Sequence, residues 1–92
     1  MKRRAIIVDD EADARARLRR LLAGHADQIE IVGEAADGIS AVSTIESLSP
    51  DLGFLDIEMP GLNGFQLLDS LPRASWPLIV FTTAYDQYAI RA

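Results

Sequence analysis

The chain has 92 residues, of which 49% are hydrophobic and 25% are charged, and it contains no cysteine. This length supports one small domain with one core. The missing thiols exclude disulfides and thiolate metal sites and fit a cytoplasmic setting. Nine basic and fourteen acidic residues leave a net charge of −5, which disfavours non-specific binding of this chain to nucleic acid or anionic membranes. No window resembles a membrane span.

The first predicted strand and helix are joined by a run of acidic residues. Residues 4–8 predict a strand, and Asp9, Asp10 and Glu11 follow it directly. Negative charge is favourable at the start of a helix, and apolar residues at helical spacing predict a helix over residues 12–23. We expect the arginines of this helix to form a solvated face or, alternatively, a surface that docks a partner. They are Arg15, Arg17, Arg19 and Arg20.

The next segments predict a strand, a helix and a strand. Partial alternation over residues 29–35 predicts an edge strand. Apolar residues at every third position predict a helix over residues 39–48, which Ser49, Pro50 and Asp51 end. Residues 52–55 are mostly apolar and predict a buried strand.

The remaining segments continue the alternation. A helix capped by Asn63 is expected to end at Pro72, and residues 78–82 predict a fourth strand. Residues 86–92 resemble the opening of a further helix. Strands that alternate with helices predict right-handed βαβ units, and therefore an α/β fold with a parallel sheet and helices on both faces.

Polar groups follow three of these strands at the same end, where ligands bind in open parallel sheets. Asp9 and Asp10 follow the first strand, Asp56 the third and Thr83 the fourth. Clustered carboxylates repel one another unless a cation neutralises them, and an all-oxygen donor set suits Mg²⁺. Aspartate is also a nucleophile toward phosphoryl groups, and the hydroxyl of Thr83 is positioned to bind a phosphoryl oxygen.

Three motifs, at residues 8–11, 54–64 and 81–85, resemble those of the receiver domain of two-component response regulators in order and spacing. Residues 83–89 are most similar to receivers that precede a LytTR-type DNA-binding domain, a class of transcription regulators. The resemblance covers the whole chain. It implies a flavodoxin-like doubly wound sheet of strand order 2-1-3-4-5 and a phosphoprotein switch rather than an enzyme.

The resemblance also implies a role for each site residue. Asp56 is the expected acceptor of a phosphoryl group from a sensor histidine kinase. The side chains of Asp10 and Asp56 would bind Mg²⁺ together with the backbone carbonyl of Glu58, and Asp9 would act through water.

Residues after the third and fourth strands complete the expected site. Thr83 would bind the phosphoryl group as the switch hydroxyl, and Ala84 would leave room for it. Glu58 and Tyr85 flank the site, at positions that tune dephosphorylation and access in the family.

Two features depart from the family pattern. The lysine that ends the family's fifth strand is missing, and Lys2 lies at the wrong end of the first strand, roughly 20 Å away at about 3.3 Å per residue. We therefore expect residues 1–92 to form a C-terminally incomplete receiver with strand order 2-1-3-4. Gly53 replaces an apolar branched residue, and we expect it to weaken its strand by about 1 kcal/mol.

An incomplete receiver predicts exposed apolar surface. The outer edge of strand 78–82 would lack a partner strand, and Leu18, Leu21 or Leu22 of the first helix would be partly uncovered. We therefore expect that the chain either self-associates through this edge and face or is a fragment of a longer protein. Mg²⁺ binding should survive without the lysine, whereas phosphorylation of Asp56 should be impaired.

Two alternative functions stay open at this point. One is a phosphorylation-independent dimerisation or interaction module, which the missing lysine favours. The other is an Mg²⁺-dependent phosphohydrolase. Haloacid-dehalogenase-type phosphatases, however, carry Asp-x-Asp after the first strand, where this chain has Asp9-Asp10-Glu11.

Overall fold

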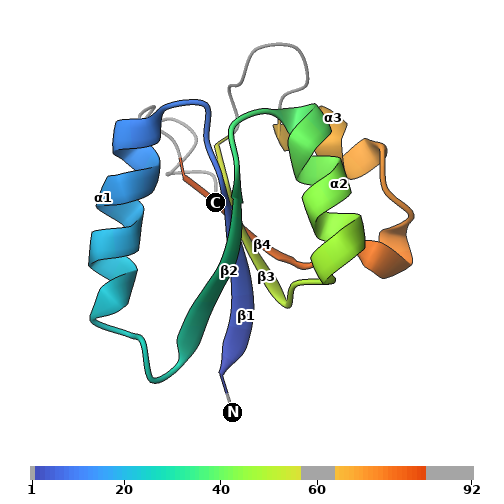
Figure 1. Ribbon diagram of the computed structural model, residues 1–92. Coiled ribbons are helices and arrows are strands. Elements are labelled where there is room, and N and C mark those ends of the chain that lie inside the picture. Colours follow the sequence, from blue (N-terminus) through green and yellow to red (C-terminus); the bar gives the residue numbers. More distant parts are fainter. Residues whose placement is uncertain (1, 57–63, 83–92) are drawn as a thin grey trace.

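A computed structural model describes residues 2–56 and 64–82 of the chain (Figure 1). These residues form a parallel sheet with helices on both faces. In chain order the elements are β1 (Arg3–Val8), α1 (Ala12–Ala23), β2 (Ile29–Ala35), α2 (Gly38–Leu48), β3 (Leu52–Leu55), α3 (Gly64–Asp69), the short 3₁₀ helix η1 (Arg73–Ser75) and β4 (Leu78–Phe81).

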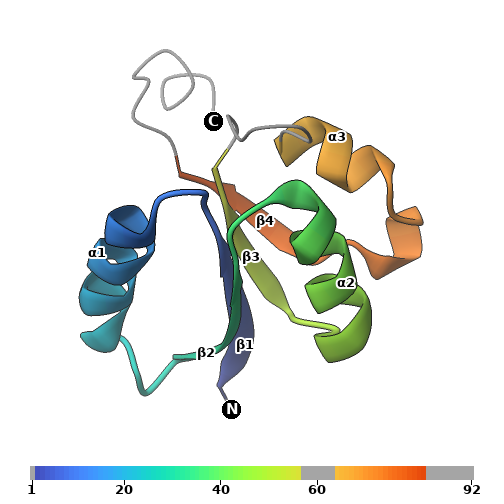
Figure 2. The same ribbon diagram turned by 45° about the horizontal axis from the view of Figure 1, so that its top comes forward.

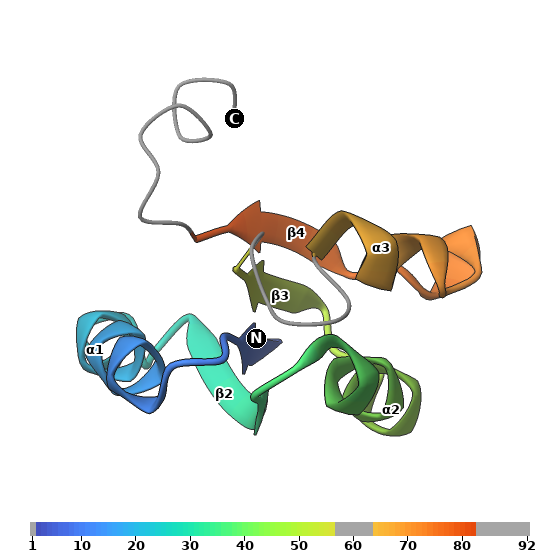
Figure 3. The ribbon, with the colours of Figure 1, turned by 90° about the horizontal axis from the view of Figure 1, so that it is seen from above.

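The sheet has the order β2-β1-β3-β4 within the described residues, and all neighbours are parallel. This confirms the predicted flavodoxin-like fold. In Figure 3, which shows the molecule from above, α1 lies on one face of the sheet beside β2 and β1, while α2 and α3 lie on the other face. Figure 2 brings forward the edge at which the four strands end.

The main core lies between the sheet and the helices α2 and α3. Successive side chains of β1 and β3 point to opposite faces of the sheet, and both strands are buried almost continuously because both faces are covered. Ile45 of α2 is only 2% exposed and packs among them. The cluster consists of Ile6, Val8, Ala35, Ala41, Ile45, Leu55, Leu67, Leu68 and Leu71.

The face that carries α1 is less completely covered. None of the residues of α1 is buried, and the side chain of Leu21 is 66% exposed while Leu18 and Leu22 are partly buried. On β4, Leu78 is 72% exposed and Val80 is 41% exposed. Leu21 is thus exposed as expected, whereas Leu18 and Leu22 are partly covered. Among the described residues, no helix is long and apolar enough to cross a bilayer.

Helix α3 ends earlier than the sequence predicted. Its last residue is Asp69, three residues before Pro72. The N–H of Ser70 lies 3.1 Å from the carbonyls of both Gln66 and Leu67, and that of Leu71 donates to Leu68, so the final turn tightens to the 3₁₀ pattern. Leu71 stays buried, which is why the apolar spacing continues past the helix. The expected cap, Asn63, lies outside the described residues.

The two ends of α2 have identifiable caps. The carboxylate of Asp37 accepts a hydrogen bond from the N–H of Ser40 at 2.7 Å, which lowers the pKa of Asp37. At the other end, Ser49 adopts φ 46°, ψ 58°, a left-handed conformation, while its N–H still donates to the carbonyl of Ile45. Such a residue satisfies the end of the helix at a conformational cost.

Gly53 is needed for close packing, which the sequence did not reveal. A Cβ atom at this position would lie 2.9 Å from Cδ1 of Leu55 and 3.5 Å from side-chain atoms of Ile79 and Pro77. Leu55 is fully buried and has little room to move. The glycine therefore accommodates its neighbours instead of only weakening the strand.

Candidate functional site

Backbone hydrogen bonds extend one residue beyond the strands and place the site residues side by side. The N–H of Asp56 donates to the carbonyl of Val8 at 2.9 Å. In the same way, the N–H of Asp9 donates to Ala35 at 3.1 Å, and that of Thr82 to Leu55 at 2.7 Å. Each strand end is thus held by its neighbour, which fixes where Asp9, Asp56 and Thr82 begin to project from the sheet.

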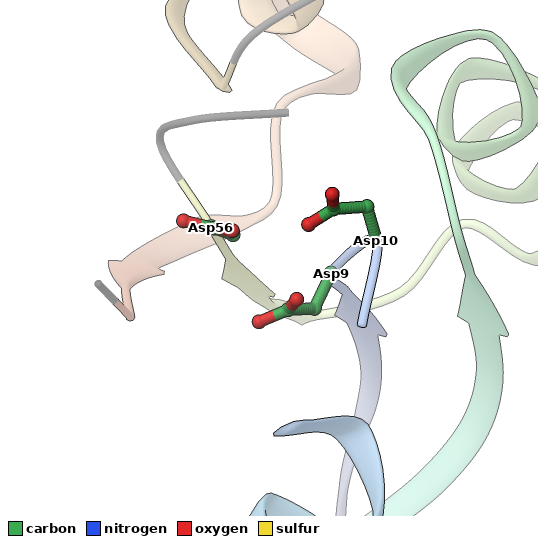
Figure 4. A group of neighbouring side chains, drawn as sticks. All are labelled: Asp9, Asp10 and Asp56. Atoms are coloured by element: carbon green, nitrogen blue, oxygen red, sulfur yellow. The ribbon is translucent and has the colours of Figure 1, made fainter. Parts of the chain in front are cut away.

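The carboxylates of Asp9, Asp10 and Asp56 converge at this edge (Figure 4). One carboxylate oxygen from each lies within 4.8 Å of those of the other two. Asp9 and Asp56 are partly buried and Asp10 is exposed. Three negative charges at this spacing repel one another, so the site favours a bound cation. Hard oxygen donors at a partly hydrated edge fit Mg²⁺, which retains several of its waters.

Asp9 has a structural contact as well as a place in the cluster. Its Oδ1 accepts a hydrogen bond from the N–H of Glu11 at 2.9 Å, which closes a tight turn before α1. The other carboxylate oxygen of Asp9 accepts no bond from this turn and can face a cation or its waters.

A network of two arginines and a glutamate joins α1 to β2 beside this turn. Nε of Arg15 lies 3.0 Å from Oε1 of Glu34, and Arg19 pairs with the other carboxylate oxygen of Glu34. Hydrogen bonding from Arg19, together with the charges of both arginines, holds the pKa of Glu34 below its usual range, although partial burial opposes this. Arg19 is still 47% exposed, as the predicted solvated face requires, whereas Arg15 is only 20% exposed and departs from that prediction.

A hollow of about 330 Å³ leads from the acidic cluster along α1. Glu11, Arg17 and Thr82 line this hollow, although none of them was among the residues predicted for the site. The sequence does indicate part of this lining, because Glu11, Ala14, Leu18 and Leu21 follow one another by three or four residues and so share one face of α1. The full lining is Asp9, Glu11, Ala14, Arg17, Leu18, Leu21, Asp56 and Thr82.

The predicted site residues divide into two groups. The structure brings Asp9, Asp10 and Asp56 together at the ends of β1 and β3. The other four expected site residues lie outside the described residues. They are Glu58, Thr83, Ala84 and Tyr85.

Comparison with known families decides the class of protein. The family model described as the response regulator receiver domain matches residues 5–92. The chain belongs to this family.

Curated relatives of this receiver domain are response regulators. This chain is 48% identical over 89 residues to the transcriptional regulatory protein BtsR of Salmonella typhimurium, and 53% identical over 89 residues to an uncharacterized response regulatory protein of Yersinia pestis. Each match covers 97% of this chain and 37% of the relative. The chain thus spans little more than a third of the length of these relatives.

Solved structures share the fold of this receiver domain. The response regulatory domain of mrkE from Klebsiella pneumoniae has a TM-score of 0.80 and 38% identity, over 97% of this chain and 73% of that one. The receiver domain of NarL from Mycobacterium tuberculosis has a TM-score of 0.81 and 32% identity, over 97% and 72%. The prediction of a two-component receiver is confirmed. Receiver domains are generally signalling switches rather than enzymes, which disfavours the phosphohydrolase alternative.

Proposed function

We propose that this receiver domain takes a phosphoryl group from a sensor histidine kinase onto Asp56. The observation that carries the proposal is the convergence of Asp9, Asp10 and Asp56 at the ends of neighbouring strands in a receiver fold. Asp56 leaves β3 with its backbone tied to Val8, so its carboxylate is held at the rim of the sheet.

In the proposed transfer, a carboxylate oxygen of Asp56 forms a bond to phosphorus while the bond from phosphorus to the kinase histidine nitrogen breaks. The bonding electrons return to that nitrogen. Such transfers depend on positioning and on charge neutralisation more than on acid–base chemistry. Bound Mg²⁺ supplies that neutralisation, and Asp10 and Asp56 would hold it with their side chains and Glu58 with its backbone carbonyl. Asp9 would orient water in the coordination shell.

Residues outside the described part of the chain have proposed roles that rest on the family resemblance. Thr83 would bind a phosphoryl oxygen, and Ala84 would leave space for the group. Glu58 and Tyr85 would control access and the rate of dephosphorylation. For the whole protein, the relatives named as transcriptional regulatory proteins support a role in transcription regulation, and we propose a LytTR-type DNA-binding output.

Intact-mass spectrometry tests the central claim. The protein is incubated with Mg²⁺ and acetyl phosphate, with Asp56→Asn as the control. We expect a single phosphoryl adduct on the unaltered protein and none on the variant. An Asp10→Asn variant should lose Mg²⁺ binding. An adduct that persists in Asp56→Asn would contradict the assignment of the acceptor.

The expected self-association stays a prediction. Leu78 and Val80 present apolar side chains on β4, and Leu21 presents one on α1, which favours the interaction-module alternative. Sedimentation velocity over a concentration series measures it. A monomer at the highest concentration, together with phosphorylation of Asp56, would remove this alternative.

A further inference from the structure

Arg15 reaches from α1 to the backbone of the acidic turn. Its Nη1 donates to the carbonyl oxygen of Asp9 at 2.7 Å, and its Nε contacts Oε1 of Glu34 at 3.0 Å. The side chain is only 20% exposed. The planar guanidinium thus bridges the edge strand β2 and the turn that follows β1, two contacts for which its rigid fork of donors is suited.

The position of the Asp9 carbonyl matters because its carbon is bonded to the backbone nitrogen of Asp10. The carbonyl of Asp9 and the N–H of Asp10 belong to one planar peptide group. A hydrogen bond that fixes this carbonyl therefore fixes the direction in which the backbone of Asp10 leaves the turn. The N–H of Asp9 is already held by Ala35, and its carboxylate by the N–H of Glu11. The contact from Arg15 restrains the remaining polar group of Asp9.

Arg19 provides an internal comparison. It pairs with the same carboxylate of Glu34 from the next turn of α1, but its hydrogen bond goes to Glu34 and not to the turn. Both arginines attach α1 to β2, whereas Arg15 also contacts the acidic turn. The contact with the Asp9 carbonyl therefore distinguishes Arg15 from Arg19 at the site.

We propose that Arg15, held by Glu34, is a positioning residue that sets the Asp9–Asp10 peptide and thereby the placement of the Asp10 carboxylate toward Mg²⁺. This inference rests on the proposed function, since it assigns Asp10 as a cation ligand. Outer-shell partners of metal ligands typically contribute about 10- to 100-fold in affinity. Because Arg15 contacts backbone rather than the ligand carboxylate itself, we expect about tenfold, the lower end of that range.

The decisive comparison is between Arg15→Lys and Arg19→Lys. Both changes conserve charge, so the electrostatic field on the acidic cluster is nearly the same in each. A lysine ammonium is a compact donor that cannot reproduce the two contacts of the guanidinium fork. Calorimetric titration with Mg²⁺ should give about tenfold weaker binding for Arg15→Lys and less than about twofold for Arg19→Lys.

A second measurement is independent of the ion. The ¹³C chemical shift of the Asp9 carbonyl reports its hydrogen bond, and it should move in Arg15→Lys but not in Arg19→Lys. Thermal unfolding of both variants measures the attachment of α1 to β2. A merely structural role would lower both melting temperatures alike and would leave Mg²⁺ affinity and the Asp9 carbonyl shift unchanged.

Each outcome decides the question. Equal Mg²⁺ affinities in the two variants, with the unaltered protein binding Mg²⁺ normally, would overturn the role of Arg15 and leave the proposed function intact. Failure of the unaltered protein to bind Mg²⁺ would overturn both. If Arg15→Lys does not fold, Glu34→Gln is used in its place and is compared with Arg19→Lys and Glu30→Gln, because it frees both arginines and removes one negative charge. Mg²⁺ binding that is several-fold weaker in Glu34→Gln than in both comparison variants supports the role, and binding equal to theirs overturns it.

Discussion

The two faces of the sheet are held by different kinds of interaction. On the face of α2 and α3, fully buried side chains such as Ile6, Leu55 and Leu67 form one continuous cluster. On the face of α1, no residue of the helix is buried, and charged contacts through Arg15 and Glu34 attach it to β2. Apolar burial contributes far more to stability than partly exposed ion pairs do. The continuous apolar cluster therefore lies on one face, and the contacts that set the acidic turn lie on the other.

The largest expected effect is in the core of the α2 face. Ile45→Ala removes a side chain that is 2% exposed and leaves a cavity, so we expect a loss of about 2–5 kcal/mol in the free energy of unfolding. Leu21→Ala on α1, 66% exposed, is the matched change on the other face and should cost under about 1 kcal/mol. Urea unfolding measures both. Equal losses would refute the contrast between the faces.

A smaller loss is expected from adding one carbon atom to the same core. Gly53→Ala places a Cβ atom 2.9 Å from Cδ1 of the fully buried Leu55. Overpacking of this kind costs about 1–3 kcal/mol, whereas an alanine without such a neighbour would stabilise a strand relative to glycine. Urea unfolding shows whether Gly53→Ala is less or more stable than the unaltered protein. A stabilised variant would mean that Leu55 has room to move, and that this face is less tightly packed than the contacts indicate.

The α1 face should be sensitive to acid and salt. Glu34→Gln should cost at most about 1 kcal/mol at pH 7 and low ionic strength. The folded pKa of Glu34 is lowered, so its contribution is fully present above about pH 4.3 and is lost as the pH falls through the lowered folded value. The difference in the free energy of unfolding between the unaltered protein and Glu34→Gln should therefore shrink in acid, and also in 1 M salt.

The exposed Glu30 on the same strand gives a control for that prediction. Glu30→Gln should leave the urea midpoint almost unchanged under all of these conditions. A Glu34→Gln difference that stays constant from pH 7 into acid would show that the ion pair does not attach α1.

The smallest expected effect is a gain in stability at the end of α2. Ser49 ends α2 at φ 46°, a conformation that costs a residue with a Cβ atom about 1–2 kcal/mol. Ser49→Gly removes this penalty but adds about 0.5–1 kcal/mol of backbone entropy cost. We expect a net stabilisation of about 0.5 kcal/mol, seen as a higher melting temperature. No gain would indicate that the Ser49 side chain supplies a compensating contact.

The pattern of apolar residues predicted helices and strands correctly where its period matched the conformation of the backbone. Strand 29–35 and helix 12–23 occur as predicted because alternation and helical spacing match their burial. The end of α3 was placed too late because Leu71 remains in the core after the backbone has changed to 3₁₀ geometry. Patterns of apolar residues report burial, and they report backbone conformation only indirectly.

The acidic site was predictable in part, and for a specific reason. Asp9, Asp10 and Asp56 follow apolar strands directly, so the topology of a parallel sheet is enough to bring them together. The contacts of Arg15 depend on Glu34, nineteen positions further along the chain. No local pattern encodes which glutamate an arginine meets after the chain has crossed from α1 to β2.

The hydrogen bonds that extend past the strand ends also determine when the site can exist during folding. Asp9 with Ala35, Asp56 with Val8 and Thr82 with Leu55 join residues that are distant in sequence, and such contacts form late because loop closure must come first. Partly folded chains should therefore lack a competent cation site. A bound ion would then favour only the complete sheet and raise its stability by mass action, so Mg²⁺ concentration becomes a measure of how completely the sheet has formed.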